Sequence, residues 1–195
     1  TEVTLGKTRD VGEYQKILSS NLDELSHLTT LIDKLLLLAR ADHSNIHLEK
    51  STFNNADKFQ LSCDYFNILA EEKNINLSHH GDIWLLADLT LFRQALNNLI
   101  DNAIKYTNNG GEVNLRSTQE ARHIKITISD NGIGIEKNRM DNLFNRFYRI
   151  KHGKINGSGL GLAITQSIMK LHKGSISIES NLHQSTTVTL RFPKK

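Results

Sequence analysis

The stretch that decides the fold is Asn98-Leu99-Ile100-Asp101-Asn102-Ala103-Ile104-Lys105. Its polar residues Asn98, Asn102 and Lys105 are four and three positions apart, so they share one face of a helix. The opposite face is apolar, with Phe92, Leu96, Leu99 and Ala103 at helical spacing. The pattern predicts a helix over about 89–107 that buries one face and presents two amides and an ammonium on the other. Such a face can cradle a magnesium–triphosphate, because amide oxygens are hard ligands and an ammonium neutralises phosphate.

Two glycine-rich motifs follow this helix along the chain. The first, Asp130-Asn131-Gly132-Ile133-Gly134-Ile135, comes directly after an alternating strand pattern, and the second, Gly157-Ser158-Gly159-Leu160-Gly161-Leu162, opens a helix. Neither is a Walker loop or a Rossmann turn, because the Gly-Lys-Ser/Thr ending and the third glycine are missing. The carboxylate of the first motif can accept a hydrogen bond from an exocyclic amine such as that of adenine. The second motif places backbone N–H groups at a helix N-terminus, where anions bind.

Composition excludes several classes of function. The 24 Lys and Arg exceed the 21 Asp and Glu only slightly and form no run, which argues against nucleic-acid binding. The single cysteine, Cys63, excludes a disulfide framework, and its apolar neighbours predict a buried side chain. No apolar run is long enough to span a membrane, and no secretory signal pattern is present. Because the chain begins at Thr1 without a methionine, we expect a soluble piece of a longer protein.

The chain divides into a helical and a mixed region. Residues 11–42 predict one long helix whose apolar stripe needs partner helices, and Thr1–Leu5 predicts the tail of a preceding helix, as in half of a four-helix bundle. A long helix packed on its own domain remains the alternative. Further along, we expect helices over 56–74, 89–107 and 160–171, the last ended by Gly174, and strands around Trp84, 113–115, 124–128, 176–178 and 188–192. The fold class is α+β: a helical hairpin remnant, then an α/β sandwich with an antiparallel-leaning mixed sheet and helices on one face.

Four motifs taken in order resemble the nucleotide-binding boxes of sensor histidine kinases. They are Asn98–Thr107, Asp130–Ile135, Phe144-Asn145-Arg146-Phe147-Tyr148-Arg149 and Gly157–Leu162. The resemblance covers essentially the whole chain: 1–42 as the C-terminal part of the dimerisation and phosphotransfer hairpin, 43–52 as a linker, and 53–195 as the catalytic ATP-binding domain. The helical segment is further similar to the heavy-metal (copper or silver) sensor subgroup, which implies metal-ion signalling.

The resemblance implies ATP and magnesium as cofactors and a role for each matching residue. Asn102 would be the magnesium ligand, supported by Asn98 one turn earlier. Lys105 and Arg149 would contact phosphate, and Asp130 would read the adenine amine. Further nucleotide contacts are implied for Tyr106, Gly132, Gly134, Ile135, Phe147, Gly157, Gly159, Leu160, Gly161, Leu162 and Thr186. Residues 151–156, with Gly153, would form a short mobile lid.

Two departures from the family pattern stand out. His183-Gln184-Ser185 replaces the glycines that family members carry in the last hairpin. None of the nine histidines has the acceptor context of an acidic residue followed by a proline, so we expect the acceptor upstream of Thr1. His27 is expected on an exposed helix face, and His79-His80 in a loop. The implied partners are the chain's own dimerisation domain in a homodimer and a response regulator, in the cytoplasmic portion of an inner-membrane protein.

The residue four positions before the magnesium asparagine separates transfer from hydrolysis. Related ATPases carry a water-activating glutamate there, whereas this chain has Asn98, a neutral amide that is no base near neutral pH. The chemistry left is positioning and charge neutralisation for transfer to an imidazole. Two alternatives stay open: a nucleotide-binding dimerisation scaffold without transfer activity, and an anti-sigma serine kinase, which the long helix over 11–42 disfavours.

Overall fold

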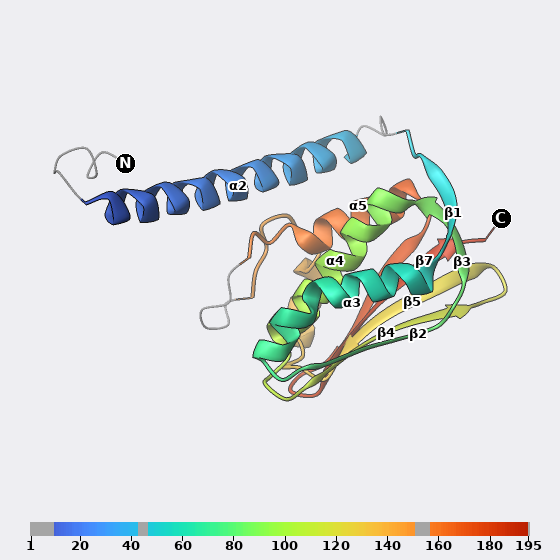
Figure 1. Ribbon diagram of the computed structural model, residues 1–195. Helices are drawn as coiled ribbons and strands as arrows, with labels where there is room; N and C mark the ends of the chain where they lie inside the picture. Colours follow the sequence, from blue (N-terminus) through green and yellow to red (C-terminus); the bar gives the residue numbers. More distant parts are fainter. Residues whose placement is uncertain (1–9, 43–46, 151–156, 195) are drawn as a thin grey trace. The chain divides into compact units, whose positions relative to one another are not determined.

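The computed structural model describes residues 10–42, 47–150 and 157–194, and Figure 1 shows their course. The chain divides into two compact units, residues 1–37 and 38–195. Within the described ranges, no helix has both the length and the apolar character that crossing a bilayer requires. The predicted helix tail at Thr1–Leu5 and the predicted lid at 151–156, with Gly153, lie outside the described residues, as does the side chain of His27.

Helix α2 (Val11–Asp42) confirms the predicted long helix. Asp10 caps its start, because the Asp10 Oδ1 accepts a hydrogen bond of 2.8 Å from the backbone N–H of Glu13. The predicted apolar stripe is present and remains exposed at Leu18, Leu22, Leu25, Leu28, Ile32 and Leu35. A run of exposed leucines along one helix face is typical of a surface that packs against further helices.

The second unit contains a five-stranded mixed sheet with the strand order β2-β4-β5-β7-β6. Strand β2 pairs with β4 in parallel, and the other neighbours are antiparallel. The strands are β2 (Asn76–His80), β4 (Glu112–Gln119), β5 (His123–Asp130), β6 (Ser175–Asn181) and β7 (Ser185–Pro193). The antiparallel-leaning sheet that alternation predicts is therefore confirmed.

Three helices cover one face of this sheet, as predicted (Figure 1). They are α3 (Asn55–Glu72), α4 (Leu89–Tyr106) and α5 (Gly161–Leu171). A two-stranded antiparallel ribbon of β1 (Lys50–Asn54) and β3 (Trp84–Asp88) lies outside the main sheet, and η1 (Lys137–Asn142) is a short 3-10 helix. The α+β fold class is confirmed.

Several details differ from the sequence-based prediction. Strand β1 begins at Lys50, inside the segment 43–52 predicted as a linker. His79 and His80 end strand β2 rather than lying in a loop, and they bond to Gln60 and Asn114 at 3.0 and 3.4 Å. The sequence did not predict β2 because an edge strand of only five residues, with no fully buried position, shows no alternation of apolar and polar residues. Among the described residues, no group of three or more His, Cys, Asp or Glu gathers as metal ligands.

The end of helix α5 has a different cause from the one expected. The helix stops at Leu171, and Lys173, not Gly174, takes the left-handed backbone with a φ of 57°. Gly174 is needed for closeness instead, because a Cβ there would lie 2.4 Å from the Arg191 carbonyl oxygen of β7.

The core is built on one face of helix α4. Its residues Leu91, Phe92, Ala95, Leu96, Leu99, Ile100, Ala103 and Ile104 are all buried. All but Leu91 and Ala95 belong to one cluster with the inward residues of the sheet, among them Leu115, Ile126 and Leu190. Cys63 is buried as predicted, and burial next to Asp64 raises its thiol pKa to about 11. Helix α4 is thereby fixed in rotation, and its remaining face is directed away from the core.

The C-terminal end of α4 is held by a single lysine. The Lys73 ammonium donates hydrogen bonds to the carbonyl oxygens of Ile104, Lys105 and Thr107, at 2.7, 3.2 and 2.9 Å. These carbonyls lie where a helix has no partners of its own, and a cation there also suits the helix dipole.

Replacing Lys73 by Met removes all three donors at once. We expect Lys73→Met to lower the free energy of unfolding by about 2 kcal/mol, because the α4 carbonyls lose charged hydrogen bonds. Urea denaturation of the whole chain measures this, with Lys170→Met on the exposed side of α5 as the matched control expected to change little. Equal effects of the two substitutions would contradict the capping role.

Candidate functional site

The polar face of helix α4 lies beside the N-terminus of α5. Asn98, Asn102 and Lys105 are half-buried, on the side opposite the core, as their spacing predicts. The Asn98 amide donates a long hydrogen bond of 3.5 Å to the Gly161 carbonyl oxygen. A Cβ built on Gly161 would lie 3.7 Å from the Asn102 amide nitrogen. The structure thus brings together the first and last of the four motifs, more than fifty residues apart in sequence.

Lys105 has a partner that sequence reasoning missed. Its Nζ lies 2.5 Å from the Asp101 Oδ2, and both side chains are more than a third exposed. The i, i+4 spacing of the two residues was a usable signal. Because exposed ion pairs contribute little, moving the ammonium from Asp101 to a phosphate would cost little free energy.

The Asp130 motif folds against the C-terminal end of helix α4. Asp130 is the last residue of β5, and its Oδ1 accepts a hydrogen bond of 3.0 Å from the Gly132 N–H. The Ile133 N–H donates to the Tyr106 carbonyl oxygen at 3.1 Å. A Cβ on Gly132 would lie 2.3 Å from that same oxygen, so only glycine lets the loop come this close.

The Asp130 carboxyl group is held in an unfavourable environment for its charge. Burial raises its pKa to about 6, against the opposing effect of hydrogen bonds from the backbone N–H groups of Gly132 and Thr186. Thr186 lies directly opposite Asp130 on strand β7. A half-buried carboxylate with an elevated pKa is suited to accept a hydrogen bond from a ligand that enters beside it.

The end of β6 and the turn between β6 and β7 contact the Asp130 loop. Gly134 has a φ of +64°, and a Cβ on it would lie 2.0 Å from the Asn181 carbonyl oxygen. The Ile135 N–H donates to the Ser180 Oγ at 2.9 Å, and the Ser180 Oγ also lies 2.9 Å from the Thr186 Oγ1. Ser180 was not predicted, and nothing in its strand pattern distinguishes it.

The β6–β7 turn stays bonded to the Asp130 loop although it lacks the glycines that family members carry there. His183 itself takes a left-handed backbone with a φ of 60°, and its N–H donates to the Ile133 carbonyl oxygen at 2.7 Å. A histidine therefore stands in a backbone conformation that favours glycine.

The segment that ends at Ile150 meets the second glycine motif. The Phe147 N–H donates to the Gly159 carbonyl oxygen at 3.0 Å, and both residues have positive φ values, 63° and 69°. A Cβ on Gly159 would lie 2.7 Å from the Phe147 carbonyl carbon, whereas a Cβ on Gly157 would meet open space. The Phe147 side chain is 62% exposed.

The remaining predicted residues fall into two groups. Arg149 lies close enough to Tyr106 to act on its pKa, which burial raises, the Arg149 charge lowers and the Asp101 charge raises. Leu160 is fully buried, and Leu162 packs against the core cluster. The two leucine side chains therefore anchor the glycine motif to the domain.

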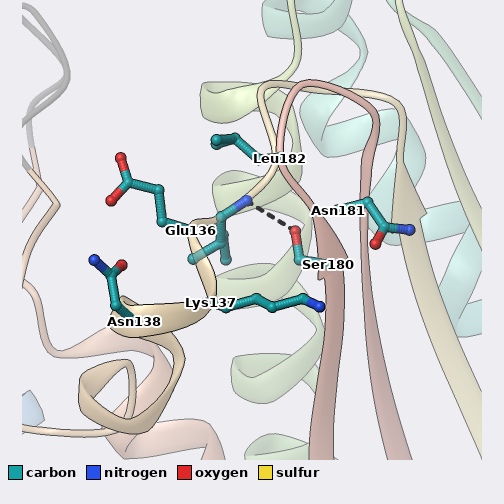
Figure 2. Close-up of a pocket in the computed structure, with 7 residues that line it drawn as sticks. Glu136, Lys137, Asn138, Ser180, Asn181 and Leu182 are labelled. Atoms are coloured by element: carbon teal, nitrogen blue, oxygen red, sulfur yellow. Dashed lines mark hydrogen bonds between the residues drawn. The ribbon is translucent and has the colours of Figure 1, made fainter.

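A pocket of about 440 Å³ lies next to this region (Figure 2). Its lining residues are Ile135, Glu136, Lys137, Asn138, Ser180, Asn181 and Leu182. Ile135 is the only predicted site residue among them, and its N–H donates a hydrogen bond to the Ser180 Oγ. Neither Asn102 nor Asp130 lines this pocket.

Residues 87–195 match the family described as histidine kinase-, DNA gyrase B-, and HSP90-like ATPase. Over 98% of its length, the chain is 35% identical to the sensor protein IrlS of Burkholderia pseudomallei. Over 93%, it is 35% identical to the sensor histidine kinase CusS of Escherichia coli. It spans 42% and 38% of the lengths of these two relatives. The solved structure of the Acinetobacter baumannii histidine kinase AdeS has the same fold, with a TM-score of 0.81 at 22% identity, covering 98% of this chain and 89% of that one.

Alanine at Gly134 tests the fit between the Asp130 loop and the β6–β7 turn. We expect Gly134→Ala to destabilise the chain by about 3 kcal/mol, because both the positive φ and the collision with Asn181 must be relieved. The matched control is Gly110→Ala, where φ is +76° and no atom lies within 4 Å of the added Cβ. Gly110→Ala should cost only about 1 kcal/mol in the same denaturation experiment. Similar losses at both positions would show that the close contact has no energetic weight.

Asp130→Asn tests the cost of the buried carboxylate. The pKa change from 3.8 to about 6 corresponds to about 3 kcal/mol at most, of which we expect about 1–2 because the side chain is partly exposed. Between these pH values the folded protein keeps a proton that the unfolded chain has released, so wild-type stability falls as the pH rises. The Asn variant should lose less stability than the wild type between pH 4 and pH 7 in the absence of nucleotide. Parallel pH profiles would contradict the raised pKa.

Proposed function

The chain belongs to the family of histidine kinase-, DNA gyrase B- and HSP90-like ATPases, and from this premise we propose that it is the ATP-binding catalytic region of a sensor histidine kinase. The resemblance to sensor histidine kinases predicted from the four motifs is confirmed by the relatives. In this proposal the chain binds Mg-ATP and its γ-phosphoryl group passes to an acceptor histidine outside this chain.

The observation that carries the proposal is the convergence of three motifs around the C-terminal half of α4. The amides of Asn98 and Asn102 lie beside Gly161, and the Asp130 loop is bonded to the Tyr106 carbonyl oxygen. A carboxylate, two amides and a helix N-terminus therefore surround one region. These groups fit an adenine amine, a magnesium ion and a phosphate chain in turn.

Different residues would bind the adenine end and the phosphate end of the nucleotide. Asp130 would accept a hydrogen bond from the adenine amine, in a pocket shaped by Gly132, Gly134 and Ile135, with Thr186 beside it. Tyr106 and Phe147 would pack against the nucleotide. The loop Gly157–Leu162 would follow the phosphates with its backbone N–H groups.

At the phosphate end, Asn102 would hold the magnesium ion with support from Asn98. Bound magnesium supplies neutralisation of the phosphate charge. Lys105 and Arg149 would add positive charge where phosphoryl transfer concentrates the negative charge. Because Asn98 cannot take a proton from water, the site favours positioning of an incoming imidazole over hydrolysis.

The longer protein would supply the remaining parts. We propose that residues 1–42 belong to a dimerisation hairpin, that 43–52 lead from it, and that 53–195 form the catalytic domain. The exposed leucines of α2 support this division, because they need a partner surface. Relay to a response-regulator aspartate, a response to copper or silver, and placement on the cytoplasmic side of an inner membrane rest on the resemblance.

Loss of transfer in site variants tests the proposal. We expect Asn102→Ala and Asp130→Ala each to lower transfer of radiolabelled γ-phosphate in the full-length protein by about a hundredfold or more, because the first loses the proposed magnesium ligand and the second the acceptor that orients the adenine. Asn108→Ala, an exposed asparagine just beyond α4, is the matched control and should leave transfer unchanged. Transfer that survives in either site variant would refute the site assignment.

Titration of this chain with a fluorescent ATP analogue separates the proposal from its alternative. A nucleotide-binding dimerisation scaffold would bind the analogue while the full-length wild type transferred no label. The intact set of motifs favours active transfer.

A further inference from the structure

A buried histidine joins the far ends of helices α4 and α5. His172 follows the last residue of α5 and is 2% exposed. Its Nδ1 lies 2.8 Å from the Ile168 carbonyl oxygen, and its Nε2 lies 3.0 Å from the Asp88 backbone nitrogen. A carbonyl oxygen only accepts and a backbone N–H only donates. These two partners therefore require a neutral imidazole with the proton on Nδ1 and the lone pair on Nε2.

Asp88 makes this contact significant for helix α4. It is the N-cap of α4, where its Oδ1 accepts from the Leu91 N–H at 3.1 Å. Its Oδ2 accepts a hydrogen bond, also 3.1 Å long, from the backbone N–H of Glu49, the residue just before strand β1. One residue thus connects the start of α4, the segment ahead of β1 and, through its own N–H, the end of α5.

His172 and Gly161 lie at opposite ends of α5, which runs antiparallel to α4. At the His172 end, α5 meets the N-terminus of α4, and at the Gly161 end it meets Asn98 and Asn102. Eleven helical residues separate these ends by about 16 Å. Figure 1 shows α4 and α5 side by side. Because the C-terminal end of α5 is held by His172, the direction of the helix and the position of its N-terminal end are restricted as well.

We infer that His172 is a positioning residue, whose Nε2 bond to the Asp88 N–H keeps the N-terminus of α5 against the Asn98 and Asn102 face of α4. The inference rests on the proposed function for its effect on nucleotide binding. Its effect on the structure of the nucleotide-free chain is independent of that function. His172 does not contact the nucleotide and acts only through the placement of α5.

The surroundings keep the imidazole neutral. Burial lowers the pKa of His172, the Ile168 carbonyl raises it, and the charges of Lys50 on β1 and Asp88 lower and raise it respectively. From β7 the Phe192 ring packs edge-on, with the ring centres 5.5 Å apart. A proton on Nε2 would face the Asp88 N–H, donor against donor, and the bond would be lost.

Two substitutions separate the two bonds of the imidazole. Asn reaches as far as Nδ1, so His172→Asn keeps a donor for Ile168 but has no atom at the Nε2 position. Gln is longer, so His172→Gln can still accept from the Asp88 N–H. The two variants therefore differ in whether residue 172 can accept from the Asp88 N–H, while both side chains remain polar and of similar size.

The test uses the whole 195-residue chain. In nucleotide-free ¹H–¹⁵N spectra, we expect His172→Asn to shift the Gly161 amide and the Asn102 side-chain amide, and His172→Gln to leave both near their wild-type positions. With a fluorescent ATP analogue, we expect Kd to rise about tenfold for Asn and to stay within about twofold for Gln, because misplacement of one helix end misaligns the site.

Equal shifts in both variants, or unchanged Gly161 and Asn102 signals in His172→Asn, would overturn the inference. If the wild type does not bind the analogue, the proposed function fails, and the nucleotide-free spectra still decide the role of His172. If His172→Asn does not fold, acid titration replaces it, in an Asp130→Asn background that removes the site carboxylate whose pKa is raised to about 6. The Gly161 amide must then shift with the same midpoint as the His172 ring, and a different midpoint would refute the link.

Discussion

Burial of one face of helix α4 is the constraint on which the rest of the structure depends. Eight buried apolar side chains fix the rotation of the helix, and this alone directs Asn98, Asn102 and Lys105 to the other side. The same rotation places the carbonyl oxygen of Tyr106 where the Asp130 loop bonds to it. A core that holds the helix in one orientation therefore also holds the ligand groups, with no separate scaffold for them.

The site carries local costs that the core must offset. Asp130 keeps a carboxylate in a half-buried position, and Phe147 and His183 adopt backbone conformations that L-residues rarely take. Gly132 and Gly134 bring the backbone into contacts that no side chain permits. Asp130, Gly132 and Gly134 lie in the Asp130 loop, His183 lies in the β6–β7 turn that bonds to that loop, and Phe147 lies in the segment that bonds to Gly159. Among the described residues, positive φ values at non-glycine positions also occur at Asn74 and Lys173, so the strained backbone is not confined to this region.

Periodicity was sufficient for the elements that bury a full face. The long helix over 11–42, the helix that became α4 and the alternating strands around 124–128 and 188–192 were predicted because each repeats its apolar residues over several turns or pairs. Strands β1 and β2 were missed, since five residues at an edge carry too little pattern. The site motifs were visible in sequence, and so was the spacing that pairs Lys105 with Asp101. The contact between His172 and Asp88 was not, because it joins residues 84 positions apart.

The hydrogen bonds of the Asp130 loop have a consequence for amide exchange with solvent. The Ile133 N–H is bonded to helix α4 and the His183 N–H is bonded to the loop, so deuterium enters these two positions only when whole elements separate. The neighbouring Gly132 N–H is bonded to the Asp130 carboxylate, so its protection follows the charge and position of one side chain. Adjacent amides in a single loop therefore record two different events, the opening of the domain and the state of its acidic group.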